Sequence, residues 1–205
     1  MKEIKNLVID FGGVIINLAR NRCIEAFAAL GIDVREQLNN NYLHKDMFMA
    51  IELGQMTAAE FRDAIRLLTS RKVTNKQIDD AWICMINDVP AYKLDLLLEL
   101  KKKYNTLLLS NTNEFHWSWS EKNVFSYKGY QAADFFNKIY LSYKLHMVKP
   151  HAGIFEYVIK DAGIIPQESL FIDDALPNCR TAESLGFRTY MPGAGEDWRH
   201  LFSPL

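Results

Sequence analysis

Four short, continuous runs of apolar residues limit what this chain of 205 residues can fold into. The runs cover residues 4–9, 106–109, 138–141 and 169–172, and a weaker fifth covers 187–191. Continuous apolar runs of this length are typical of strands in a parallel sheet that is buried on both faces. Helical patterns lie between the runs. The alternation therefore predicts an α/β fold, a Rossmann-like open parallel sheet with right-handed crossovers.

One connection between these runs is much longer than a crossover requires. Residues 17–89 contain helix signals and no convincing strand, whereas a crossover between parallel strands needs only about a dozen residues. Within this stretch, Thr57 and Glu60 form a capping-box pattern that predicts the start of a helix. We therefore expect a small helical bundle at 17–89, inserted as a cap into an α/β core made of residues 1–16 and 90–205.

The helix predicted after Thr57 places Phe61, Ile65 and Leu68 on one face. A second capping residue, Thr74, precedes another apolar stripe that includes Trp82.

Composition excludes several classes of function. The formal net charge is -1, and no basic stripe favours binding to nucleic acid or to an anionic membrane. No apolar run approaches the roughly 20 residues that span a bilayer, and the N-terminus lacks the pattern of a signal peptide. The three cysteines are far apart, which indicates a reducing compartment. We expect a cytoplasmic protein, and the sequence leaves its oligomeric state open.

Polar residues follow the predicted strands at the points where ligands bind in open parallel sheets. Asp10 follows the first run, Ser110-Asn111-Thr112 the second, and Lys149 lies shortly after the third. Asp173 and Asp174 follow the fourth. Each piece has an ordinary alternative as a turn residue, a helix cap or a surface charge. Four such pieces in order at successive strand ends favour one common site.

The chemistry of this set is coherent. Mg²⁺ prefers oxygen ligands and commonly takes one or two carboxylates together with phosphate and water. Asp10, Asp173 and Asp174 offer carboxylates, and Gly12 offers an unobstructed backbone carbonyl. A carboxylate can also act as a nucleophile toward phosphate when a metal ion and a lysine such as Lys149 neutralise the repulsion. The sequence therefore predicts a Mg²⁺-dependent site for a small phosphate ester.

The ordered motifs resemble those of the haloacid dehalogenase (HAD) superfamily of phosphohydrolases. They are the Asp10-Phe-Gly-Gly-Val-Ile segment, Ser110-Asn111-Thr112, Lys149-Pro150 and the segment that ends in Asp173-Asp174. The helical insert resembles the C1 cap of that family, which closes over the site and selects the substrate. Within the superfamily, the motifs are similar to those of bacterial glucose-1-phosphate phosphatase-like members.

The resemblance implies a role for each residue. Asp10 is the expected nucleophile and a metal ligand, and Gly12 contributes a second ligand through its carbonyl. Asp174 is the main acidic ligand of the fourth motif, and Asp173 lies beside the metal or just behind it. Lys149 orients nucleophile and phosphate. The phosphate is expected to be held by the Ser110 hydroxyl and by the backbone N–H groups of Asn111 and Thr112, while Asn178 supports Asp174 or a metal-bound water.

The expected activity is therefore that of a Mg²⁺-dependent phosphomonoesterase acting through an aspartyl-phosphate, with a sugar phosphate as the favoured substrate. One position departs from the family pattern. Gly12 stands where most family phosphatases carry an acid that transfers protons, a contribution of typically about 10²–10⁴-fold. A non-catalytic or very slow phosphate-binding protein is thus an alternative. A 2-haloacid dehalogenase is a weaker one, because those enzymes need no metal and typically lack the acidic fourth motif.

Two further features follow Thr112 in the sequence. His116 is interpreted as a partly exposed loop residue rather than as a replacement for the missing acid. An aromatic stretch is interpreted as a hydrophobic cover or contact surface rather than as a pocket wall; it consists of Phe115, Trp117, Trp119, Phe125, Tyr127 and Tyr130.

Overall fold

The computed structural model describes residues 3–39 and 47–202. Its centre is a five-stranded parallel sheet with the strand order β3-β2-β1-β4-β5. The strands are β1 (Asn6–Ile9), β2 (Asn105–Ser110), β3 (Lys138–Leu141), β4 (Ser169–Ile172) and β5 (Arg188–Tyr190). The predicted α/β fold is confirmed, because each of the five apolar runs overlaps one of the five strands.

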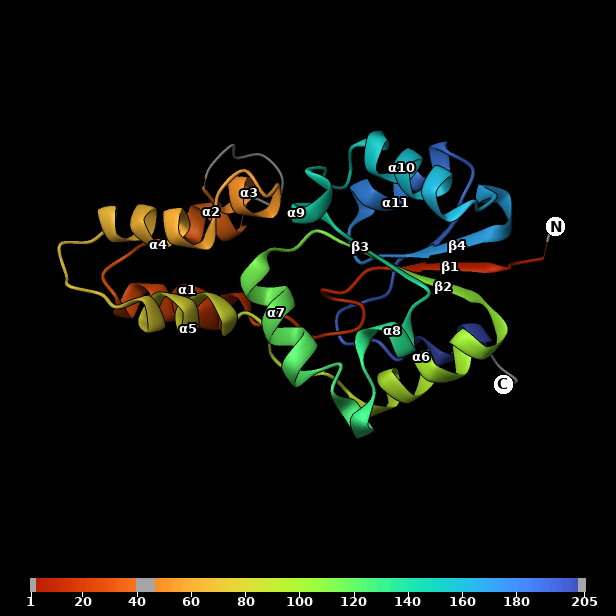
Figure 1. Cartoon of the computed structure of the whole chain (residues 1–205), viewed down its shortest axis with the longest axis horizontal. Coiled ribbons are helices and arrows are strands. Elements are labelled where there is room, and N and C mark those ends of the chain that lie inside the picture. The colour runs from red at the N-terminus through yellow and green to blue at the C-terminus, as the bar shows by residue number, and fades with distance from the viewer. Residues whose placement is uncertain (1–2, 40–46, 203–205) are drawn as a thin grey trace.

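Helices cover both faces of the sheet, as Figure 1 shows. One face is covered by α10 (Ala152–Ala162) and α11 (Leu176–Ser184), and the other by α6 (Ala91–Lys103) and α8 (Ala132–Phe135). Neighbouring residues of β1 bury their side chains in different layers. Leu7 and Ile9 belong to one apolar cluster, while Val8 belongs to the other. This two-sided burial explains why the strands are continuously apolar.

The chain between β1 and α6 forms the helices that project from one end of the sheet in Figure 1. They are α1 (Arg20–Ala29), α2 (Arg35–Asn39), α3 (Met47–Glu52), α4 (Ala58–Leu67) and α5 (Asn75–Ile83). The predicted capping box at Thr57 is present, and the predicted capping residue Thr74 also forms a capping box, with Gln77. No helix in the described ranges is long and apolar enough to cross a membrane.

These helices pack around an apolar cluster of their own, separate from the two clusters that flank the sheet. The cluster includes Phe27, Phe48, Phe61 and Trp82, whose rings contact one another. Of the three apolar residues placed on one face of α4, Phe61 and Ile65 are buried, whereas Leu68 is 47% exposed. Leu68 follows the last helical residue, so the helix ends before its side chain turns toward the cluster.

Among the described residues, the helical insert contacts the α/β core on two sides. The insert loop after α3 rests on the short helix α9 (Ser142–Leu145): a Cβ atom on Gly54 would lie only 2.0 Å from the Tyr143 carbonyl oxygen. Beside it, His146 Nδ1 lies 2.9 Å from the carbonyl oxygen of Leu53. On the other side, Phe115 of α7 (Glu114–Asn123) packs into the insert's apolar cluster.

Candidate active site

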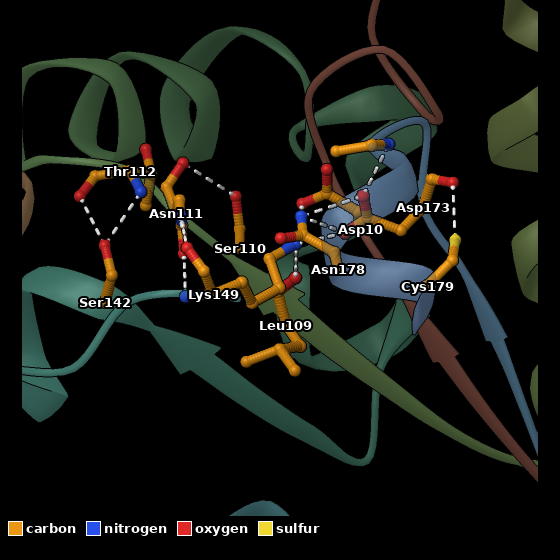
Figure 2. A network of polar contacts seen from close by, with 11 residues as sticks. Asp10, Leu109, Ser110, Asn111, Thr112, Ser142, Lys149, Asp173, Asn178 and Cys179 are labelled. Atoms are coloured by element: carbon orange, nitrogen blue, oxygen red, sulfur yellow. Dashed lines mark hydrogen bonds and ion pairs between the residues drawn. The ribbon is translucent and has the colours of Figure 1, made fainter. Parts of the chain in front are cut away.

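The predicted strand-end residues meet at the carboxyl edge of the sheet, as Figure 2 shows. Asp10 directly follows β1, Ser110 is the last residue of β2, and Asp173 directly follows β4. Lys149 lies between α9 and α10. Because parallel strands end at the same edge, residues more than a hundred positions apart in the sequence come together there.

Lys149 is the centre of this arrangement. Its side chain is 1% exposed, and its Nζ lies 2.8 Å from Asp10 Oδ1 and 2.6 Å from Asp173 Oδ2. The same Nζ donates to the Leu109 carbonyl oxygen at 2.9 Å. Burial opposes the charge of the ammonium, but the carboxylates of Asp10 and Asp173 raise its pKa above the ordinary value. Lys149 therefore stays protonated and holds the two carboxylates on either side of it.

The Asp173 carboxylate is fully engaged by its neighbours. In addition to Lys149, Asn178 Nδ2 donates to both of its oxygens, at 2.9 and 3.1 Å, and the Ala175 backbone N–H donates to Oδ1 at 2.8 Å. The Asn178 amide N–H groups are thus used on Asp173, and the expectation that Asn178 supports Asp174 or a metal-bound water stays a prediction. The arrangement makes Asp173 an anchor for the lysine.

Asp10, Asp173 and Asp174 each place a carboxylate oxygen within 4.8 Å of the others. Burial, together with the charges of Asp173 and Asp174, raises the pKa of Asp10 to about 7 despite the opposing effect of Lys149. Burial and the charge of Asp173 also raise the pKa of Asp174. Carboxylates that crowd together against their own repulsion fit a cation such as Mg²⁺, which prefers oxygen ligands and neutralises this repulsion.

The close approach of Asp174 depends on Gly13. This glycine has a φ of +75°, and a Cβ atom at its position would lie 2.2 Å from Asp174 Oδ2. Only glycine meets both demands. The Gly12-Gly13 step thus brings the first and fourth motifs together.

Gly12 is small for a different reason. A Cβ atom there would lie 3.2 Å from Leu18 Cδ1, which already fills the adjacent space. Leu18 belongs to the segment that leads into α1, and it forms an isolated antiparallel bridge with Ile86 on the returning segment. A Cβ atom at position 12 would therefore require the end of the Leu18 side chain to shift by a few tenths of an ångström.

The segment from Ser110 to Thr112 is organised by hydrogen bonds to the neighbouring loops. The Asn111 side-chain amide donates to the Lys149 carbonyl oxygen at 2.8 Å and accepts from the Lys149 N–H at 2.9 Å, a reciprocal pair that fixes the lysine's backbone. The Thr112 N–H donates to Ser142 Oγ at 2.9 Å, and Ser142 Oγ in turn donates to the Thr112 carbonyl oxygen. The expectation that the Thr112 N–H binds phosphate is therefore wrong, because this N–H already donates to Ser142 Oγ.

A pocket of about 160 Å³ opens above Asp10 and extends to the helical insert. Its sheet side is lined by Asp10, Gly12, Ser110, Asn111, Thr112, Lys149 and Asp174. The insert contributes mainly apolar side chains from α2, α3 and α5, together with the polar side chains Arg20, Gln37 and Glu52. The charged groups at the sheet edge thus face a largely apolar wall across one pocket.

His116 lines this pocket, and the interpretation of it as a partly exposed loop residue is wrong. It lies inside α7 and is 9% exposed. Its Nε2 lies 3.0 Å from the Trp82 carbonyl oxygen, and its Nδ1 lies 3.2 Å from Asn113 Nδ2. Burial lowers the pKa of His116 to about 4. A neutral ring whose Nε2 donates and whose Nδ1 accepts satisfies both contacts, so both nitrogens are committed and His116 is unsuited to proton transfer.

The aromatic stretch after Thr112 does not form the pocket wall. None of its six residues contributes to the pocket among the described residues. Trp117 and Phe125 are buried in the apolar cluster on the α6 side of the sheet, where both contact Phe11. The structure therefore supports the interpretation of Trp117 and Phe125 as part of a hydrophobic cover.

Sequence and structure comparisons bear directly on this arrangement. A model of the haloacid dehalogenase-like hydrolase family matches residues 4–186. A D-ribitol-5-phosphate phosphatase from Bacteroides thetaiotaomicron is 41% identical over 196 residues, which cover 96% of this chain and 95% of that protein.

Solved structures of relatives agree with this result. A HAD family enzyme from B. thetaiotaomicron, crystallised as an aspartate-to-alanine variant with magnesium and inorganic phosphate, is 51% identical. The match covers 97% of this chain and 98% of that one, with a TM-score of 0.93. A predicted HAD-like family hydrolase from Porphyromonas gingivalis is 35% identical, with 98% and 97% of the two chains covered and a TM-score of 0.91. Matches of this length and identity lead to one assignment: the chain belongs to the haloacid dehalogenase-like hydrolase family.

Proposed function

We propose that this protein is a Mg²⁺-dependent phosphomonoesterase that hydrolyses a small phosphorylated metabolite, a sugar phosphate or sugar-alcohol phosphate, through an aspartyl-phosphate on Asp10. The observation that carries the proposal is the buried contact of Lys149 with both Asp10 and Asp173, beside the exposed carboxylate of Asp174. The names of the relatives support the same reading, since one is a phosphatase of a sugar-alcohol phosphate and another was solved with magnesium and phosphate.

Mg²⁺ would be held by Asp10 and Asp174, with the Gly12 carbonyl as a third protein ligand. Of the candidate ligands, we assign Asp173 a supporting position, because its oxygens already accept hydrogen bonds from Lys149, Asn178 and Ala175. When bound, the metal supplies positive charge that neutralises the carboxylates and the phosphate oxygens.

The residues of the chain then act as follows. An Asp10 carboxylate oxygen forms a bond to phosphorus while the bond from phosphorus to the ester oxygen breaks. Lys149 keeps Asp10 in position and offsets negative charge at the reacting group. The Ser110 hydroxyl and the Asn111 backbone N–H bind phosphate oxygens. Water then attacks the aspartyl-phosphate, which releases inorganic phosphate and restores Asp10. With Gly12 in place of an acid and His116 held neutral, water in the pocket protonates the leaving alcohol.

Residues 17–89 act as the cap in this proposal, and residues 1–16 and 90–205 form the core. The separate apolar cluster of the insert supports this division. So does the pocket, which is lined from both sides. The contacts of Leu53 and Gly54 with the segment around α9 would hold the cap closed over the substrate.

The proposal is tested with a panel of phosphate esters that includes D-ribitol 5-phosphate and glucose 1-phosphate, assayed with and without Mg²⁺. We expect phosphate release that requires Mg²⁺ and is lost in Asp10→Asn. A folded protein that binds phosphate but releases none from any ester would establish the phosphate-binding alternative. Metal-independent halide release from a 2-haloacid would establish the dehalogenase alternative.

A further inference from the structure

Lys93 is a buried charge that the proposed reaction does not use. It lies on α6, it is 1% exposed, and it does not line the pocket. Its Nζ donates to the Val14 carbonyl oxygen at 2.6 Å, and within the described residues it forms no ion pair. Burial lowers the pKa of Lys93 despite the opposing charge of Asp197, because taking an ammonium group out of water is costly. An apolar side chain would fill this position at lower cost, so what the lysine adds is the hydrogen bond to Val14.

The same carbonyl oxygen has a second donor. Trp198, the first residue of the 3₁₀ helix η3 (Trp198–Phe202), is 1% exposed, and its Nε1 lies 3.2 Å from the Val14 oxygen. A carbonyl oxygen has two lone pairs, and no backbone N–H of the described residues bonds to this one. The lysine and the tryptophan therefore take both acceptor positions. Because α6 precedes β2 and η3 follows β5, two segments far apart in the sequence converge on one backbone atom.

Val14 belongs to a tight turn that carries both glycines of the first motif. The Phe11 carbonyl oxygen accepts from the N–H groups of Ile15 and Ile16, each at 3.0 Å. The Gly13 N–H donates to the Ile16 carbonyl oxygen at 2.8 Å. The turn is thus bonded internally, so a group that holds the Val14 carbonyl holds the turn as one unit.

This turn lies against the fourth motif with little room to spare. A Cβ atom on Gly13 would lie 2.2 Å from Asp174 Oδ2, so the turn and this carboxylate are in close contact. Gly12, next to it, offers the carbonyl oxygen that the proposed metal site uses. Mg²⁺ demands near-ideal octahedral geometry, with ligands at about 2.0–2.1 Å. Even a small displacement of the turn relative to Asp174 therefore weakens the binding of the ion.

We propose that Lys93 and Trp198 are positioning residues for the metal site: through the Val14 carbonyl they hold the turn where Mg²⁺ requires it. This inference rests on the proposed function, which makes Gly12 and Asp174 ligands, and it adds two residues that lie outside the pocket. Residues that orient metal ligands from behind change metal affinity by roughly 10- to 100-fold when they are replaced. Their loss should lower the affinity of the folded protein for Mg²⁺, whereas a purely structural role would lower only its stability.

The test measures the binding of Mg²⁺ alone to the folded protein by calorimetry. Lys93→Met removes the ammonium group and keeps a long side chain, and Trp198→Phe removes the indole N–H. We expect the Kd for Mg²⁺ to rise about 10-fold in Lys93→Met. In Trp198→Phe, which loses only a neutral hydrogen bond, it should rise about 3-fold. With p-nitrophenyl phosphate, a general phosphatase substrate, the Mg²⁺ concentration for half-maximal turnover should rise by the same factors, while KM for the ester at saturating Mg²⁺ stays unchanged.

Two control variants match these substitutions away from the turn. Lys101→Met lies on the same helix and removes an Nζ that donates to a different carbonyl oxygen, that of Phe136, at 3.1 Å. Trp119→Phe replaces a second tryptophan that packs against the same apolar cluster as Trp198. Neither control should change the Kd for Mg²⁺. Thermal melting without Mg²⁺ identifies a variant that fails to fold, and the other variant of the pair then decides.

The inference is overturned if Lys93→Met and Trp198→Phe melt earlier but bind Mg²⁺ as wild-type protein does, because the two residues are then structural only. An equal loss of affinity in the two controls would overturn it as well. Failure of the proposed function looks different: wild-type protein that binds Mg²⁺ but releases no phosphate from any ester contradicts the function, and the Kd values still decide the inference. Wild-type protein that binds no Mg²⁺ would contradict both.

Discussion

The sheet side and the insert side of the pocket differ in the kind of interactions that hold their side chains. On the sheet side, charges and amides are tied to one another: Lys149 bridges Asp10 and Asp173, the Asn111 amide pairs with the Lys149 backbone, and Asn178 Nδ2 donates to Asp173. On the insert side, aromatic rings pack together around an apolar cluster. A rigid network of paired charges suits a chemical step that is the same for every substrate. A mostly apolar wall with a few polar side chains suits the choice of substrate.

If this contrast holds, substitutions on the sheet side should lower turnover of every ester. Asp10→Asn should have the largest effect, a loss of roughly 10⁴-fold or more in kcat, because the nucleophile is removed. Without metal, the substitution should not destabilise the folded state. Burial raises the pKa of Asp10 to about 7, so at pH 8 the ionised carboxylate lowers the stability of the folded protein, and asparagine removes that charge.

The measurement is phosphate release together with thermal melting at pH 8, with Asp33→Asn on the exposed surface of the insert as the control. Turnover that survives in Asp10→Asn would show that the carboxylate at the sheet edge is not needed for the reaction.

Lys149→Met should have the largest effect on stability. It leaves the buried carboxylates of Asp10 and Asp173 without their counter-charge, and breaking a buried ion pair costs about 3–5 kcal/mol. Chemical denaturation at pH 7 measures the loss. Mg²⁺ should restore part of it, because the ion offsets the same carboxylates. Lys138→Met, at an exposed ion pair with Asp161, is the control and should change the free energy of unfolding by less than about 1 kcal/mol. Equal losses in the two variants would contradict the buried network.

His116 lies where the two sides meet, and it makes stability depend on pH. Its pKa is lowered to about 4 by burial, while in the unfolded chain it is about 6.5. Between these values the unfolded state binds more protons than the folded state, so stability falls as pH falls through this window. The expected contribution between pH 8 and pH 5 is about 2 kcal/mol.

Denaturation curves of wild type and His116→Gln at both pH values isolate this contribution. The glutamine variant should lose less stability on acidification, and parallel losses would show that His116 is not held neutral.

Thr57→Ala should have the smallest effect and should be confined to the insert. It removes the capping box of α4, in which Thr57 Oγ1 accepts from the Glu60 N–H, and such losses cost about 1 kcal/mol. We expect a lower melting temperature with turnover of p-nitrophenyl phosphate unchanged. Thr181→Ala, whose hydroxyl donates within α11, serves as the comparison on the sheet side. A large loss of turnover in Thr57→Ala would show that the insert takes part in the chemical step.

Features set by neighbouring residues could be predicted from the sequence, whereas contacts between residues far apart in the sequence could not. Strand ends and helix caps are local, so the motif residues and the capping boxes at Thr57 and Thr74 could be located from the sequence. The partners of Thr112 and His116 are set by the fold: Ser142 lies 30 positions from Thr112, and Trp82 lies 34 positions from His116. One local signal was available for His116. Asn113 caps α7 and places His116 in its first turn, which argues against a loop.

The contact between Gly12 and Leu18 has a consequence for how this chain could change over evolutionary time. An acid at position 12 would place a proton donor two residues after Asp10, but its Cβ atom would lie 3.2 Å from Leu18 Cδ1, so the end of that side chain would have to shift by a few tenths of an ångström. A smaller residue at position 18 would remove this demand. The two positions are therefore coupled, and the effect of an acid at position 12 depends on which residue stands at position 18.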